Sequence, residues 1–168
     1  GIKAGGGMYL NGGTYKIDSA DDSIHSNANI TIADGTYTLA TGDDGVHADD
    51  ALIVNGGTIT VTESYEGLEG LAVTINDGTI DITASDDGIN TAGEKMELNG
   101  GYIHILAGGD GVDSNGDLTI NGGEIYIDGP SDNGNSAIDY GDRSSAYVNG
   151  GTLVAIGSSG MAEVMSDS

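Results

Sequence analysis

The chemically distinctive residues of this sequence are acids that recur at one point of a repeating pattern. Pairs such as Asp43-Asp44 and Asp86-Asp87 are each followed by a glycine and then by an apolar residue. When the repeats are aligned, one acid from each of five repeats falls in a first column: Asp22, Asp44, Glu66, Asp87 and Asp110. A second column, three residues further on, holds His25, His47, Glu69, Asn90, Asp113 and Asp139. Carboxylates stacked about 5 Å apart repel one another unless they splay, take up protons or share a cation.

Oxygen ligands in glycine-containing turns match the preference of calcium, which takes 6–8 oxygens and tolerates irregular geometry. We therefore predict Ca²⁺ as the cofactor, with ligands drawn from these acids: Asp22, Asp44, Glu66, Glu69, Asp87, Asp110 and Asp113. Asp44 is expected to group with Glu66 and Glu69, and a second group is expected at Asp87, Asp110 and Asp113. The alternative is that the Asp-Gly pairs only form turns, because aspartate tolerates left-handed backbone and bonds to its own backbone.

Two histidines and a few basic residues offer other chemistry. His25 and His47 are neighbours in the second column and could bind zinc or nickel, but the column has no third histidine, so an exposed polar pair competes. Base-catalysed elimination on a uronate needs a base near calcium, commonly a lysine or an arginine. The four basic residues, Lys3, Lys16, Lys95 and Arg143, fall in different columns, so we expect no enzyme activity.

The charge balance of the chain restricts its partners. Four basic against 27 acidic residues give a net charge of −23. Nucleic acids and anionic membrane surfaces are bound through Lys and Arg, so neither is an expected partner. No apolar run approaches the ~20 residues that span a bilayer, so no membrane insertion is expected. The absence of cysteine excludes disulfides and thiolate metal sites.

The elements that must position the acids are short strands in a repeat of about 22 residues. An Asn-Gly-Gly or Asp-Gly turn recurs, and its last glycine is Gly13, Gly35, Gly57, Gly78, Gly101, Gly123 and Gly151. Alignment on this glycine produces five apolar columns, in pairs two residues apart, which is the period of a strand with one buried face. One of these columns is Ile2, Ile24, Val46, Leu68, Ile89, Val112 and Ile138.

Strands this short must pair with the equivalent strand of the next repeat, which produces a parallel solenoid with coils about 4.8 Å apart. We predict an all-β fold, a right-handed parallel β-helix of about seven coils of ~22 residues with three short strands each, forming a single domain over 1–168. The chain is expected to begin inside a coil and to lack evident end caps. An asparagine column should form an amide ladder along one turn: Asn11, Asn55, Asn76, Asn99, Asn121 and Asn149. Residues 129–136 lengthen the sixth repeat, as either a functional loop or a tolerated insertion.

Outward tyrosines could provide rings for sugar stacking. Tyr102 and Tyr126 are expected to face outward on neighbouring coils, and Tyr65 and Tyr140 to lie on the side of the acidic turn. These four are the candidate carbohydrate-binding residues. Tyr15 is expected to point into the core with Tyr37.

The acidic turns also carry a family resemblance. The segments ADDSIHS, GDDGVHADD, ESYEGLEG and ASDDGIN, interleaved with NGGTI-type turns, resemble a family of secreted bacterial carbohydrate-binding domains whose fold is similar to polysaccharide lyases. The likeness covers essentially all 168 residues. It implies a calcium-loaded right-handed β-helix, extracellular or at the cell surface, that binds plant cell-wall polysaccharides such as cellulose and pectin (polygalacturonate).

Non-catalytic binding of cell-wall polysaccharide is therefore the expected function. The rival is a structural protein whose uncapped coils self-associate end to end into an extracellular fibre by strand addition. An ice-binding surface would need an unbroken threonine array. Thr58 and Thr60 could belong to one, but Asp81 and Tyr102 interrupt it.

Overall fold

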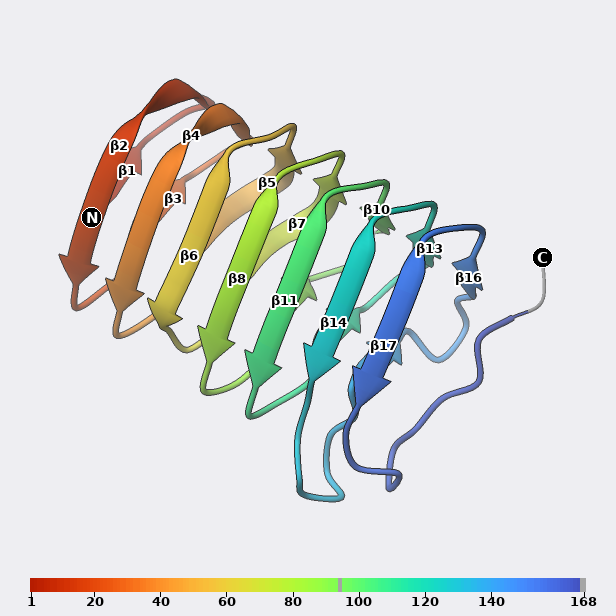
Figure 1. Cartoon of the computed structure of the whole chain (residues 1–168). Helices are drawn as coiled ribbons and strands as arrows, with labels where there is room; N and C mark the ends of the chain where they lie inside the picture. The colour runs from red at the N-terminus through yellow and green to blue at the C-terminus, as the bar shows by residue number, and fades with distance from the viewer. Residues whose placement is uncertain (94, 167–168) are drawn as a thin grey trace.

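The computed structural model describes residues 1–93 and 95–166 and is a solenoid of parallel β-strands (Figure 1). Seventeen strands form one continuous hydrogen-bonded sheet that winds around three faces. The predicted all-β parallel solenoid is confirmed, and its right-handed winding stays a prediction. Over the part of the chain that the structure describes, no helix is long and apolar enough to cross a membrane.

Each face of the solenoid carries seven rungs, so about six turns separate the first rung from the last. The second face, in front in Figure 1, contains β2 (Met8–Ser19), β4 (Ile30–Thr41), β6 (Thr58–Glu63), β8 (Thr79–Ala84), β11 (Tyr102–Ala107), β14 (Glu124–Asp128) and β17 (Thr152–Ile156). The first face contains the starts of β2 and β4, the ends of β5 (Val46–Val54) and β7 (Leu68–Ile75), and β10 (Met96–Leu98), β13 (Leu118–Ile120) and β16 (Ala146–Val148). The third face contains β1 (Ile2–Ala4), β3 (Ile24–Ser26), the starts of β5 and β7, and β9 (Ile89–Thr91), β12 (Val112–Ser114) and β15 (Ile138–Tyr140).

The early coils differ in one respect from the three separate strands expected. β2 and β4 continue through the corner between the first and second faces, and β5 and β7 continue through the corner between the third and first. Pairing persists around these corners at the cost of a register shift, as between Leu10 and Asn11. A shift of this kind bends a strand without ending its pairing. In the later coils each corner interrupts the ladder.

The apolar columns form the core in the predicted register. Ile24 pairs with Val46, Val46 with Leu68, and Leu68 with Ile89, and all four are fully buried. Full burial of an aliphatic side chain contributes about 1.5–3 kcal/mol, so repetition over the coils supplies most of the driving force. Tyr37 is also buried and stacks on Tyr15 with ring centroids 4.9 Å apart, which confirms that this pair points inward.

The asparagine ladder is confirmed for five of its six members. Side-chain amides link Asn55, Asn76, Asn99, Asn121 and Asn149 in sequence, with N–O distances of 2.7–2.8 Å. Ala33 takes the position between Asn11 and Asn55, because the Asn55 amide donates to the carbonyl of Ile32 in the same way as the Asn76 amide donates to that of Val54. Alanine has no side-chain amide, so the ladder starts at Asn55.

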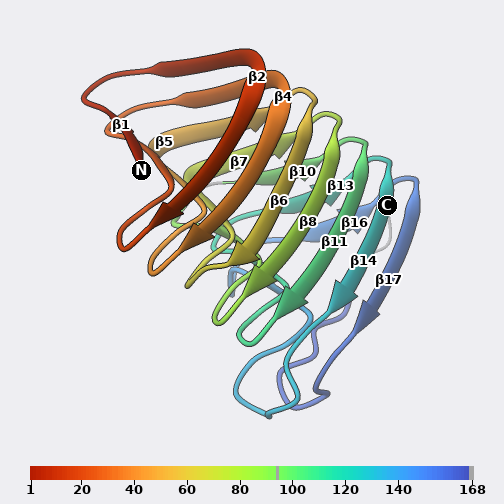
Figure 2. The same ribbon diagram turned by 60° about the vertical axis from the view of Figure 1, so that its left-hand side comes forward.

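The long sixth repeat produces a loop between β14 and β15 that extends beyond the stacked coils (Figures 1 and 2). The Ser158 hydroxyl bonds to the side chain of Asn133 in this loop at 2.8 Å. Residues 157–166 then run back along the last coil, where Ser166 forms a bridge with Tyr147. The predicted insertion therefore lies at the corner between the second and third faces.

Candidate functional site

The predicted acids line the corner between the second and third faces, where each second-face strand ends and a third-face strand begins. Asp87 lies in this corner between β8 and β9, and Asn90 lies outward on β9. The motif requires glycine at this position for a steric reason. A Cβ atom on Gly88 would lie 2.3 Å from Cγ2 of Ile105 and 2.5 Å from the carbonyl oxygen of Gly111. The next coil packs directly on this turn, which holds the acids in register.

The acids of the first column also stabilise the stacking of the coils. The amide of Asp44 donates to Oδ1 of Asp22 at 3.2 Å, and the amide of Asp110 donates to Oδ1 of Asp87 at 2.7 Å. Glu66 donates its amide to Oδ1 of Asp44 in the same way, at 3.3 Å. One oxygen of each aspartate is thus used for coil-to-coil bonding, a role that spacing alone did not reveal. The other oxygen of Asp22 and of Asp44 faces the second column, where it contacts a histidine.

Asp87, Asp110 and Asp113 come together as expected, with one ligand oxygen from each lying within 4.8 Å of the others. Calcium–oxygen distances are 2.3–2.6 Å, so two ligands of one ion lie at most about 5 Å apart. Gly109 keeps this space open, because a Cβ there would lie 2.5 Å from Oδ1 of both Asp86 and Asp87. The oxygen-only donors and the open space fit a calcium ion.

The carboxylates of this cluster repel one another, and their negative charge is not compensated by a basic side chain of the described residues. Burial, reinforced by Asp87 and Asp139, raises the pKa of Asp113 to about 7. Burial also raises the pKa of Asp87 to about 6, with Asp86 and Asp110 adding to the effect. Among the residues that the structure describes, no basic side chain forms an ion pair with Asp87, Asp110 or Asp113. A bound divalent cation would supply the missing positive charge.

The second predicted group, Asp44 with Glu66 and Glu69, also comes together within 4.8 Å, but it includes a histidine. His47 Nδ1 lies 2.9 Å from Oδ2 of Asp44 and 2.8 Å from Oε2 of Glu69. These hydrogen bonds raise the pKa of His47 to about 10, so the ring is an imidazolium that neutralises part of the group. Sequence reasoning treated His47 separately from these acids and missed this pairing.

A neutral oxygen lies between the two carboxylate groups. Asn90 donates its side-chain amide to Oε2 of Glu66 at 3.0 Å, and burial raises the pKa of that glutamate to about 7. Oδ1 of Asn90 is buried and has no hydrogen-bond partner among the described residues. A buried acceptor without a donor is costly, and a cation ligand role would satisfy it. Asn90 is therefore a candidate ligand that the sequence prediction did not include.

The histidine pair contacts carboxylates on both ring edges and is not arranged for shared metal binding. The rings of His25 and His47 are stacked 4.8 Å apart and within 4° of parallel. Their Nε2 atoms lie 3.3 and 3.5 Å from Oδ1 of Asp49, and their Nδ1 atoms face Asp22 and Asp44. The in-plane lone pairs of parallel rings do not converge on one point, so this geometry disfavours a zinc or nickel ion held by both. Asp22 also joins Asp44 and His47 in a third cluster.

The basic residues lie apart from one another. Lys3 on β1 pairs in register with His25, and Lys95 forms a 3.0 Å ion pair with Glu97 beside β10. Lys16 lies on the second-face part of β2, and Arg143 lies in the turn before β16. No two of these four side chains share a strand, which agrees with the dispersal read from the sequence.

The four candidate tyrosines occupy different settings. Tyr65 is half exposed, and a hydrogen bond with Asp86 raises its pKa to about 12. Tyr140 donates its hydroxyl to the carbonyl of Val164 at 2.7 Å, so the segment after β17 holds its ring. Tyr102 and Tyr126 are neighbours on β11 and β14, with ring centroids 5.7 Å apart and tilted by 41°. Only this last pair combines two rings on one face.

Comparison with known proteins agrees with the resemblance seen in the acidic turns. A family described as carbohydrate-binding domain-containing protein matches residues 1–45 and 43–167. No curated protein and no solved structure matches the chain. The family match covers nearly all of the sequence, including every turn described above. The chain therefore belongs to the family of carbohydrate-binding domain-containing proteins.

Proposed function

We propose that this domain binds plant cell-wall polysaccharide, without catalysis, outside the cell or at its surface, and that calcium connects it to acidic glycans such as polygalacturonate. The observation that carries the proposal is the cluster of Asp87, Asp110 and Asp113, whose carboxylates lie within 4.8 Å without a basic partner among the described residues. Membership in a carbohydrate-binding family supports a glycan as the partner. Cellulose is the expected neutral ligand.

The charge of the domain explains why a cation is needed for the acidic glycan. At a net charge of −23, contact with a polyuronate is repulsive, and physiological salt only shortens the range of that repulsion to about 8 Å. Calcium at this cluster supplies positive charge and open coordination positions for sugar carboxylates. Asp87, Asp110 and Asp113 hold it, and because Asp87 and Asp113 are only partly buried, a glycan carboxylate can reach the ion.

The Asp113→Asn variant tests this proposal. It removes one ligand charge at an outward position, so calcium-dependent binding to polygalacturonate should weaken by about tenfold or more. Asp50→Asn is the matched control, because Asp50 is exposed and lies outside the acid clusters. Pull-down on immobilised polygalacturonate, with calcium and with chelator, measures the effect. Equal binding by both variants, or wild-type binding that persists in chelator, would contradict the calcium bridge.

The same experiment addresses the fibre alternative. If the wild-type protein binds neither polygalacturonate nor cellulose in calcium and electron micrographs show long fibres, polysaccharide binding is wrong. End-to-end self-association would then be the function.

A further inference from the structure

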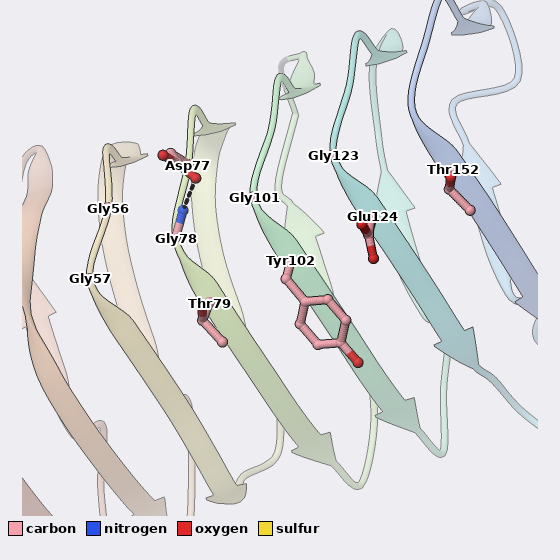
Figure 3. A pocket seen from close by; sticks show the side chains of 10 residues that line it. All are labelled: Gly56, Gly57, Asp77, Gly78, Thr79, Gly101, Tyr102, Gly123, Glu124 and Thr152. Atoms are coloured by element: carbon pink, nitrogen blue, oxygen red, sulfur yellow. Dashed lines mark hydrogen bonds between the residues drawn. The ribbon is translucent and has the colours of Figure 1, made fainter.

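A shallow groove of about 680 Å³ follows the corner between the first and second faces (Figure 3). The whole width of the second face separates this corner from the acid clusters. The residues that line the groove belong to five successive coils, from Gly56 to Thr152, which corresponds to a length of roughly 19 Å along the axis. The groove is long enough for several sugar residues.

The floor of the groove is bare backbone for a steric reason. Gly57, Gly78, Gly101 and Gly123 have φ angles of 90°, 126°, 86° and 89°, a region that favours glycine. A Cβ on Gly101 would also lie 2.6 Å from the carbonyl oxygen of Gly78 in the preceding coil. The stacking that requires these glycines therefore leaves a strip that no side chain fills. The carbonyls of these glycines each accept one amide hydrogen bond from the next coil, as Gly78 does from Tyr102 at 2.8 Å, and a carbonyl oxygen has a second lone pair for a ligand.

One wall of the groove carries an aromatic ring in a column that also contains threonines and a glutamate. Tyr102 pairs in register with Thr79 on one side and with Glu124 on the other. Its side chain is 43% exposed and projects beside the glycine strip (Figure 3). Tyr126 lies next to it, tilted by 41°. An exposed ring beside a polar strip provides a stacking surface together with hydrogen-bonding groups, which is what a sugar ring requires.

The charge of the groove distinguishes it from the acidic corner. Asp77 and Glu124 are the two ionisable carboxylates in its lining, which contains no lysine or arginine. Oδ1 of Asp77 accepts a hydrogen bond from the Gly78 amide at 2.8 Å. With no positive charge to attract a polyuronate, the lining favours a neutral ligand.

We infer that this groove binds a neutral, unbranched polysaccharide along the solenoid axis, with a sugar ring stacked on Tyr102 and sugar hydroxyls bonded to Thr79, Glu124 and the glycine backbone. The coil spacing of about 4.8 Å is close to the length of one sugar residue in an extended chain, so successive sugars meet equivalent backbone groups. The inference rests on the proposed function for the class of ligand. It assigns the neutral glycan to a corner separate from the calcium-dependent one.

Two variants test the groove. Tyr102→Thr introduces the residue that Thr79 and Thr152 already place in this column, and Thr79→Lys puts a long side chain beside the floor. Each should weaken binding to insoluble cellulose and to cello-oligosaccharides by about tenfold, in chelator, because stacking or access is lost. Binding to polygalacturonate in calcium should not change. Tyr9→Thr, at a 65% exposed tyrosine on the first face, and Thr36→Lys, in the same column but outside the groove, are matched controls.

The outcomes separate this inference from the proposed function. Unfolding temperatures establish that the variants are folded, since all four positions are exposed. If Tyr102→Thr and Thr79→Lys bind cellulose as well as the wild type does, the inference that the groove binds glycan is wrong. If the wild-type protein binds polygalacturonate but not cellulose, only the inference about the groove is wrong. Binding to neither glycan would overturn both proposals.

Discussion

In the absence of divalent cations, the domain is expected to lose stability as the pH rises from about 4 to about 7, and calcium is expected to restore it. Burial is the largest cause of the raised pKa values of Asp113 and Glu66, both about 7, and of Asp87, about 6. The ordinary values are 3.8 for aspartate and 4.5 for glutamate. The folded state therefore favours the protonated carboxyls.

The sign of the effect follows from linkage. A folded-state pKa above the unfolded value contributes stability that is fully present below the unfolded pKa and is lost as the pH rises through the folded pKa. For the three carboxyls this interval runs from about 4 to about 7. His47 acts in the same direction at higher pH, because its folded pKa of about 10 lies above the ordinary 6.5. Its contribution is lost only above the carboxyl interval.

Thermal unfolding over this pH range, with chelator and with calcium, measures the prediction. Calcium binds the ionised carboxylates, so its stabilisation should grow as they lose their protons. At a hundredfold excess over its dissociation constant, one ion adds about 2.7 kcal/mol. In Asp113→Asn, both the pH slope in chelator and the calcium response should shrink, whereas Asp50→Asn should behave as wild type. An unfolding temperature in chelator that is constant or increases over the interval would contradict the expectation.

Gly88→Ala is expected to destabilise the domain by about 3 kcal/mol, because overpacking a filled interior carries a cost of this size. The new Cβ would lie 2.3 Å from Cγ2 of Ile105, which is fully buried, and 2.5 Å from the carbonyl oxygen of Gly111. That carbonyl accepts the amide hydrogen bond of Ile89 at 3.1 Å. Relief of the contact must therefore separate two coils at the acidic corner.

Gly6→Ala is the matched control for this steric effect. A Cβ on Gly6 meets nothing within 4 Å, so the same change in chain entropy occurs without the contact. Denaturant unfolding of both variants, followed by circular dichroism, measures the difference. Similar stabilities of the two variants would show that the acidic turn has room for a side chain.

The sequence alone was sufficient for the solenoid and for two acid groups. Apolar residues at a two-residue period, repeated at an almost constant interval, can be buried together only if equivalent strands pair in register. Parallel register then places equivalent side chains next to each other, which is why Asp87, Asp110 and Asp113 could be grouped correctly. The asparagine ladder follows from the same rule. Where Ala33 replaces asparagine, the ladder stops because alanine has no side-chain amide.

The tertiary structure decided what each side chain does within its column. Column position does not specify rotamers or the partners that burial leaves available, so spacing could not show that His47 neutralises Asp44 and Glu69. It also could not show that Oδ1 of Asn90 is buried without a donor. Spacing could not show the groove beside Tyr102 either. The groove arises where glycines required by coil stacking leave the surface bare next to an exposed ring. A repeated sequence determines which residues are neighbours, whereas the packing of successive coils determines which of their atoms remain free to bind.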